Sequence, residues 1–82
     1  MIHSYKLNDF NIVLDVNSGA VHLFDDCSFD IVNLLNQDFN SLDFESISNL
    51  LSSKYDNDTI KESYNELKTL YDDEIIFSSD EE

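Results

Sequence analysis

The chain has no arginine, a single cysteine, a single glycine and no long hydrophobic run. Only four lysines stand against 18 acidic residues, which gives a formal net charge of -14. A surface this acidic repels phosphate backbones and anionic lipid headgroups. Nucleic acids and membrane surfaces are therefore poor partners for this protein.

The scarcity of cysteine and of apolar runs indicates the cellular compartment in which the protein is found. Cys27 has no second cysteine with which to form an internal disulfide, and a lone thiol fits a reducing compartment. No stretch approaches the roughly 18 apolar residues of a membrane span. The first residues also lack the basic and then apolar order of a signal peptide. We therefore expect a cytoplasmic protein.

The residues that are present suffice for one small folded domain. The chain has 82 residues, of which 41% are apolar, including six phenylalanines and four tyrosines. This apolar content argues against wholesale disorder, although a chain this short buries only about 60 to 65% of its unfolded surface. We expect a single domain over residues 1–77, followed by a loose acidic tail at 78–82.

The first 24 residues carry the signals of a three-stranded meander. Along residues 11–16 the side chains alternate with a period of two and are enriched in β-branched types, which is typical of a strand. Asn8 and the Asn17-Ser18-Gly19 segment can adopt the positive φ angles that tight turns require. The sequence thus predicts strands over residues 2–7, 10–16 and 20–24.

From residue 25 onward the apolar spacing changes to three and four, which is typical of helices with one buried face. Three helices are predicted, each preceded by a side chain that can cap it. The capping candidates are Asp25, Asp26 or Ser28 for the first helix, Ser41 or Asp43 for the second, and Asp58 or Thr59 for the third. The acidic run at 72–74 opposes the helix dipole and should end the third helix.

The predicted order is three strands and then three helices, an α+β arrangement like a winged helix-turn-helix. That fold commonly reads DNA, but a recognition helix needs cationic side chains for phosphate oxygens. The third helix instead carries Asp58, Glu62 and Glu66 against two lysines. We therefore expect the fold to read a partner other than DNA.

The sequence contains few residues in the arrangements that catalytic sites or metal sites require. Cys27 follows two aspartates, whose charges raise the pKa of a thiol and make it a poor nucleophile. His3 and His22 belong to different predicted strands and lack the spacing of a metal site. We expect neither a catalytic residue nor a metal ligand in this chain.

One segment resembles a carrier-protein motif. Residues 40–43, Asn-Ser-Leu-Asp, are similar to the Asp-Ser-Leu motif of acyl carrier proteins, which carry phosphopantetheine on the serine, here Ser41. Those proteins begin with a helix, whereas this chain begins with predicted strands, and Asn40 replaces the aspartate. Helix capping explains Ser41 and Asp43 equally well. The carrier function stays open as an alternative.

An outer strand of the predicted sheet offers a binding edge. One row of its backbone N–H and C=O groups lacks a partner strand and can accept an extended peptide. If the third strand borders the third helix, the peptide would also contact the apolar stripe of Tyr64, Leu67 and Tyr71. These side chains could instead simply fill the core. A homodimer through the same edge is a further alternative.

Residues 11–22, NIVLDVNSGAVH, together with Ile2-His3 before them and Asp25-Asp26 after them, carry a family resemblance. This segment resembles the N-terminal part of the radical S-adenosylmethionine maturases that install thioether crosslinks in SCIFF peptides, which are short, cysteine-rich ribosomal products. The resemblance covers roughly the first 35 residues. Beyond them only the helical pattern agrees.

In that family the segment is a RiPP recognition element, similar to the small winged-helix chaperone of pyrroloquinoline-quinone biosynthesis. The resemblance implies that a lysine-rich leader peptide of the precursor is captured as an added strand between the third strand and the third helix. The binding residues it implies are Ala20, Val21, His22, Leu23, Phe24, Asp25, Tyr64, Leu67, Lys68 and Tyr71.

The family's reaction depends on a Cys-x-x-x-Cys-x-x-Cys iron-sulfur motif in a barrel domain, and this chain has one cysteine. The resemblance therefore implies a non-catalytic recognition domain that needs no cofactor of its own. S-adenosylmethionine and the iron-sulfur clusters belong to the radical SAM catalytic domain, which would act in cis or in trans.

Overall fold

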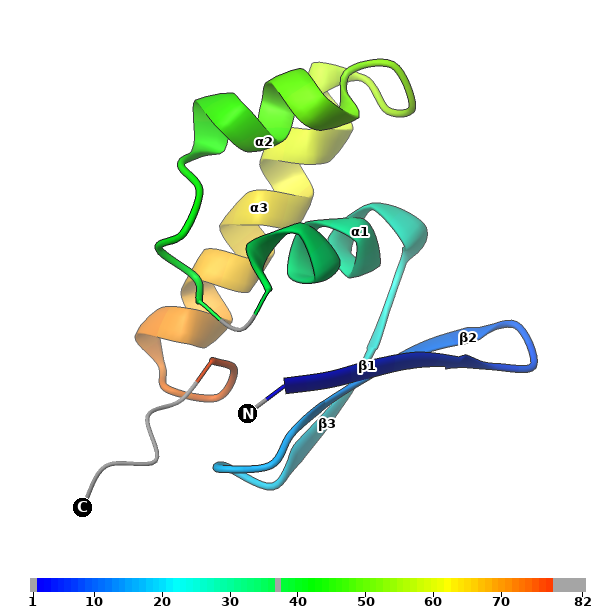
Figure 1. Cartoon of the computed structure of the whole chain (residues 1–82), viewed down its shortest axis with the longest axis vertical. Helices are drawn as coiled ribbons and strands as arrows, with labels where there is room; N and C mark the ends of the chain where they lie inside the picture. The colour runs from blue at the N-terminus through cyan, green and yellow to red at the C-terminus, as the bar shows by residue number, and fades with distance from the viewer. Residues whose placement is uncertain (1, 37, 78–82) are drawn as a thin grey trace.

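The computed structural model describes residues 2–36 and 38–77. An antiparallel sheet of three strands, in the order β1-β2-β3, is followed by three helices (Figure 1). The expected α+β arrangement is confirmed, whereas the acidic tail expected at 78–82 lies outside the described residues. The elements are β1 Ile2–Leu7, β2 Phe10–Asp15, β3 Ala20–Phe24, α1 Asp26–Leu35, α2 Phe44–Leu51 and α3 Asn57–Asp72.

Two short turns set the register of the sheet. Leu7 lies opposite Phe10, which leaves a two-residue turn where Asn8 adopts a φ of 57°. The turn between β2 and β3 has four residues and closes on Gly19, whose φ is 75°. Asparagine and glycine tolerate this left-handed backbone better than other residues, so the sequence fixes both turns locally.

The second strand ends one residue earlier than the sequence predicts, at Asp15 rather than Val16. The side chain of Asp15 is fully buried and accepts hydrogen bonds from the backbone N–H groups of Asn17, at 2.9 Å, and of Ser18, at 3.4 Å. These bonds bend the chain into the turn, because they replace the next step of the strand ladder.

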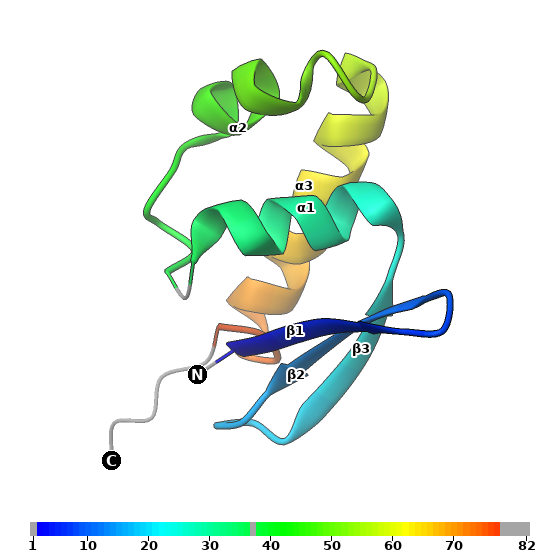
Figure 2. The same cartoon turned by 45° about the vertical axis from the view of Figure 1, so that its right-hand side comes forward.

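The sheet has two distinct faces. Along β2 the side chains of Asn11, Val13 and Asp15 are buried and lie on the face that the helices cover. Helix α1 lies across this face and packs against all three strands (Figure 2). The opposite face of the sheet is not covered by any described element.

The first two helices begin at caps that the sequence identified. The Asp25 carboxylate accepts a hydrogen bond from the Ser28 N–H at 2.8 Å, and the Asp43 carboxylate accepts one from the Ser46 N–H at 2.9 Å. Each bond satisfies a backbone donor that the first helical turn leaves without an internal partner. The second cap is Asp43, not Ser41.

The third helix begins earlier than predicted. Its N-cap is Asp56, in extended conformation, and the predicted caps Asp58 and Thr59 lie inside the first turn. The Ile60 N–H donates to the Asp56 carbonyl at 3.1 Å, which sets the start of the helix. The Thr59 hydroxyl donates to the Asp56 carboxylate at 2.6 Å instead of capping the helix itself.

The core lies between the sheet and α3. Helix α3 packs on both α1 and α2, and the fully buried apolar side chains come from every layer. After α3, Ile76 is also fully buried, and the Ser18 hydroxyl donates to the Ile75 carbonyl at 2.9 Å. The fully buried apolar residues are Val13, Ile31, Leu35, Ile47, Ile60, Leu67 and Ile76.

No helix among the described residues is long and apolar enough to cross a membrane.

Candidate functional site

Strand β3 is an edge of the sheet. It pairs with β2 on one side, and no described strand pairs with its other side. Both ends of β3 already use backbone groups: the Ala20 N–H donates to the Ser18 hydroxyl at 3.2 Å, and the Phe24 carbonyl accepts from the Asn11 side chain at 3.1 Å. An added peptide strand would therefore pair chiefly with the central residues 21–23.

The side chains of β3 alternate between the two faces of the sheet. Val21 and Leu23 are each 64% exposed and point away from the helices. His22 and Phe24 are half-buried on the helix side, where their rings stack with centroids 5.4 Å apart. The Nε2 atom of His22 is buried and has no hydrogen-bond partner among the described residues.

Helix α3 lies behind α1 when the sheet is viewed with β1 in front of β3. In both views α1 is drawn in front of α3, and β1 is drawn in front of β3 (Figures 1 and 2). Helix α3 packs on α1, which itself packs on β3.

The four residues of α3 that the sequence predicts to bind the leader make their described contacts in the core and in the helical part of the fold. Leu67 is fully buried in the core. Tyr64 and Tyr71 stack on Phe39, in the loop between α1 and α2, with ring centroids 5.6 Å and 4.4 Å away. Lys68 is exposed and forms an ion pair with Asp72 along its own helix at 3.4 Å. Tyr64 and Tyr71 therefore hold α3 against the α1–α2 loop.

The other flank of α3 is the one directed toward the end of β3. The Ser63 hydroxyl hydrogen-bonds the thiol of Cys27, which lies in the first turn of α1, directly after β3. Residues three and four apart share a helix face, so Thr59, Glu66 and Leu70 continue this flank. Ser63 and this flank could not be singled out from the sequence, because the apolar stripe alone does not tell which of its margins faces the sheet.

Cys27 is buried in the first turn of α1. Burial raises the pKa of the Cys27 thiol, the Ser63 hydrogen bond opposes this shift, and the negative charges of Asp25, Asp30 and Asp56 raise the pKa further. A thiol that stays protonated at neutral pH is a poor nucleophile.

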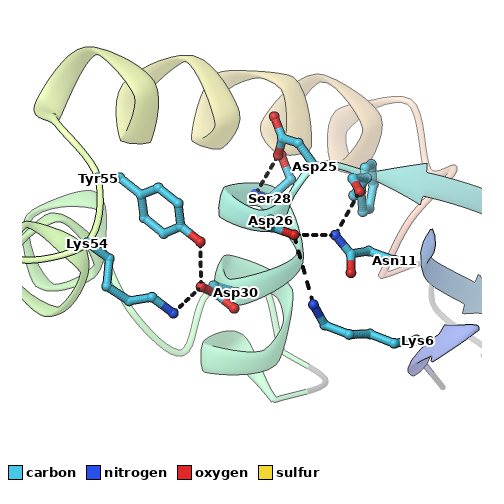
Figure 3. Close-up of polar contacts among 9 residues, drawn as sticks. Lys6, Asn11, Asp25, Asp26, Ser28, Asp30, Lys54 and Tyr55 are labelled. Carbon is cyan, nitrogen blue, oxygen red and sulfur yellow. Dashed lines mark hydrogen bonds and ion pairs between the residues drawn. The ribbon is translucent and has the colours of Figure 1, made fainter. Parts of the chain in front are cut away.

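A polar network ties the start of α1 to the sheet (Figure 3). The Asp26 carboxylate accepts a hydrogen bond from the Asn11 side chain at 2.8 Å and lies 3.9 Å from the Lys6 ammonium. Since Asn11 also donates to the Phe24 carbonyl, one amide group joins β2, β3 and α1. The network fixes the angle at which α1 leaves the candidate edge strand.

A second part of the network holds the loop between α2 and α3 (Figure 3). The Asp30 carboxylate accepts hydrogen bonds from the Lys54 ammonium at 3.0 Å and from the Tyr55 hydroxyl at 2.8 Å. Because Asp30 lies on α1, these bonds fix the start of α3 relative to the sheet.

The structure also places the residues that were considered for metal binding and for phosphopantetheine attachment. His3 and His22 lie on opposite faces of the sheet, and no group of three His, Cys, Asp or Glu side chains in the described part of the chain could hold a metal ion. The Ser41 hydroxyl donates to the Leu35 carbonyl at 2.8 Å, so it has a structural partner. Three strands and α1 precede Ser41 in the chain.

No protein-family model matches the chain, and no curated protein shows significant similarity to it.

Proposed function

We propose that this domain captures the leader of a ribosomal precursor peptide of the SCIFF type. The leader adds as a fourth strand to the edge of β3, beside α3, and the core peptide is delivered to a radical SAM maturase domain in cis or in trans. The observation that carries the proposal is the edge strand β3, whose outer side pairs with no described strand, joined to the resemblance of residues 11–22.

Backbone hydrogen bonds at residues 21–23 supply affinity that tolerates different leader sequences, each worth about 1 kcal/mol net. Specificity comes from side chains along the inner margin of α3. In this proposal Glu66 and Leu70 border the leader, while Tyr64, Leu67 and Tyr71 act indirectly by holding α3 in place.

Charge favours a lysine-rich leader. Glu62 and Glu66 are exposed on α3, and Asp25 is exposed where β3 meets α1. Their field attracts cationic side chains and speeds the encounter, and at physiological ionic strength it is screened over about 8 Å. Affinity for the leader should therefore fall as the salt concentration rises.

The domain performs no reaction of its own in this proposal. Holding the leader raises the effective concentration of the core peptide at the catalytic domain. S-adenosylmethionine and the iron-sulfur clusters of the reaction are supplied by that other domain.

The test is a titration of the ¹⁵N-labelled domain with a synthetic lysine-rich leader peptide. Amide shifts are expected in β3 and along residues 59–70, and replacing a pairing leader residue by proline should weaken binding because proline has no N–H to donate. Shifts confined to β1, or tolerance of proline at every leader position, would contradict strand addition to β3.

A matched pair of variants tests the electrostatic part. Glu66→Gln removes a charge on the proposed binding flank, whereas Glu45→Gln removes an exposed charge on α2. We expect Glu66→Gln to lower the affinity several-fold at low salt and Glu45→Gln to leave it nearly unchanged. Equal effects would mean that only the overall charge matters.

A further inference from the structure

The face of the sheet that points away from the helices is almost entirely apolar. We call it the outer sheet face, and the register aligns its side chains in three rows across the strands. Five of them are between 47% and 64% exposed, namely Tyr5, Leu7, Phe10, Val21 and Leu23. The complete face consists of His3, Tyr5, Leu7, Phe10, Ile12, Leu14, Val21 and Leu23.

The two faces of β2 are inverted relative to the usual pattern of a half-buried strand. The face that α1 covers includes Asn11 and Asp15, both buried and hydrogen-bonded, whereas Ile12 and Leu14 lie on the outer sheet face. Val13 is the one aliphatic side chain of β2 that packs into the core, and a strand that turns the other two away from it indicates that the outer face has a second covering layer.

The size of the face fits a protein interface. A large apolar or aromatic side chain offers about 150 to 250 Å², so eight partly exposed residues present about 600 Å² of mainly apolar surface. That is the upper end of the largest patch on ordinary monomers, about 300 to 600 Å², and it approaches the roughly 800 Å² that each partner buries in a standard complex.

The distribution of charged residues favours a second copy of this chain as the partner of the outer sheet face. The outer sheet face contains no Asp, Glu or Lys: Asp9 lies in the turn at its end, Asp15 points inward, and Lys6 lies on the helix side beside Asp26. Of the 18 acidic residues, 16 follow residue 24. Two copies of this chain can therefore meet at this face without bringing their carboxylates together, whereas contact through the helices would oppose two acidic surfaces.

We propose that a second copy of this chain packs on the outer sheet face, giving a two-fold symmetric dimer with its two sheets face to face. Facing sheets are about 10 Å apart. The axis of α1 lies behind its own sheet by roughly one helix diameter, about 10 to 12 Å. The α1 axes of the two copies, and the acidic helical layers around them, are therefore about 30 Å apart. That separation exceeds the Debye length of about 8 Å at physiological salt. Both edges of each sheet stay open, so this dimer is independent of the proposed leader binding.

Sedimentation equilibrium of the full chain from micromolar to millimolar concentration tests the dimer. Leu7→Lys places a charge in the interface, on a strand remote from β3, and Leu50→Lys is its control on α2, with side-chain exposures of 56% and 55%. Since the symmetry repeats each change in both copies, Leu7→Lys should raise the dissociation constant roughly tenfold or more, and Leu50→Lys should not. Circular dichroism and urea unfolding confirm that both variants fold.

The dependence of the dimer dissociation constant on sodium chloride concentration provides a second test. Added salt screens the repulsion between the two acidic copies and should strengthen the dimer, the opposite of its expected effect on a lysine-rich leader. A wild-type chain that stays monomeric throughout would overturn the proposal and leave the face to a partner of different sequence. Equal effects of Leu7→Lys and Leu50→Lys would overturn it as well, because assembly would then not use this face.

Discussion

At the scale of single residues, Asp30 connects two layers through one carboxylate. Burial raises the pKa of the Tyr55 hydroxyl above its ordinary value of 10.0, and the hydrogen bond to Asp30 and the charge of Asp30 raise it further. We predict that Asp30→Asn lowers the pKa of Tyr55 toward that ordinary value. Ultraviolet absorbance during alkaline titration measures the shift, and Tyr55→Phe identifies which part of the signal belongs to this residue.

The same group makes stability depend on alkaline pH. Because the pKa of Tyr55 is higher in the folded than in the unfolded chain, its contribution is fully present below pH 10.0 and is lost as the pH rises toward the folded value. The urea midpoint of the wild type should therefore fall above pH 10.0 more steeply than that of Tyr55→Phe. Parallel curves would show that Tyr55 does not couple to folding.

The backbone conformation of Gly19 restricts which residues can replace it. Its φ is 75°, and no heavy atom lies within 4 Å of the place where a Cβ would stand. We predict that Gly19→Ala lowers the free energy of unfolding by about 1 kcal/mol from backbone strain alone, and that Gly19→Asn costs less, since asparagine tolerates this region. Urea denaturation measures both variants, and equal losses would point to a contact rather than to the backbone.

At the scale of elements, the cap of α2 predicts an acid-dependent loss of helix. The N–H of Ser46 donates to the Asp43 carboxylate and lowers the pKa of Asp43 below its ordinary value of 3.8. The stabilisation is thus present above pH 3.8 and lost as the pH falls through the folded value. The difference in urea midpoint between the wild type and Asp43→Ala should shrink at acidic pH, and a constant difference would exclude the ionised cap as its cause.

The elements themselves could be predicted because their signals are local. Alternation, Asn8 and Gly19 define the strands and turns, and Asp25 and Asp43 cap the first two helices as expected. The third helix starts earlier than predicted because three candidate oxygens lie within four residues, and the backbone conformation of Asp56 decides between them.

The environment of the candidate site could be predicted only in part. The edge position of β3 follows from a meander of three strands, but the orientation of α3 depends on how it packs on α1. Tyr64 and Ser63 are neighbours in sequence, yet one stacks on Phe39 and the other meets Cys27. A periodic stripe gives the centre of a buried face, and the tertiary contacts decide what lies at each margin.

At the scale of the whole molecule, self-repulsion opposes folding. A net charge of -14 on 82 residues favours expanded over compact states. We predict that moderate concentrations of sodium chloride raise the urea midpoint of unfolding, because screening weakens this repulsion. Potassium chloride should raise the midpoint by the same amount. A urea midpoint that does not change with either salt would show that repulsion between the acidic side chains does not destabilise the folded chain.

The alternation of the strands also shows how far sequence reasoning extends at this scale. Residues 11–16 predict a strand, but not which of its faces meets the helices. Hydrogen bonds from Asn11 and to Asp15 make the more polar face the buried one. The outer sheet face therefore emerges only from the assembled fold.

The first strand and the segment after α3 both reach the turn between β2 and β3, which allows the chain to be reconnected in a different order. Ile2 lies opposite Asp15, at the base of the turn in which Ser18 binds the Ile75 carbonyl. A circular permutant that joins residue 77 to residue 2 through a short linker, and that opens between Ser52 and Ser53, would retain every strand pairing and all three helices.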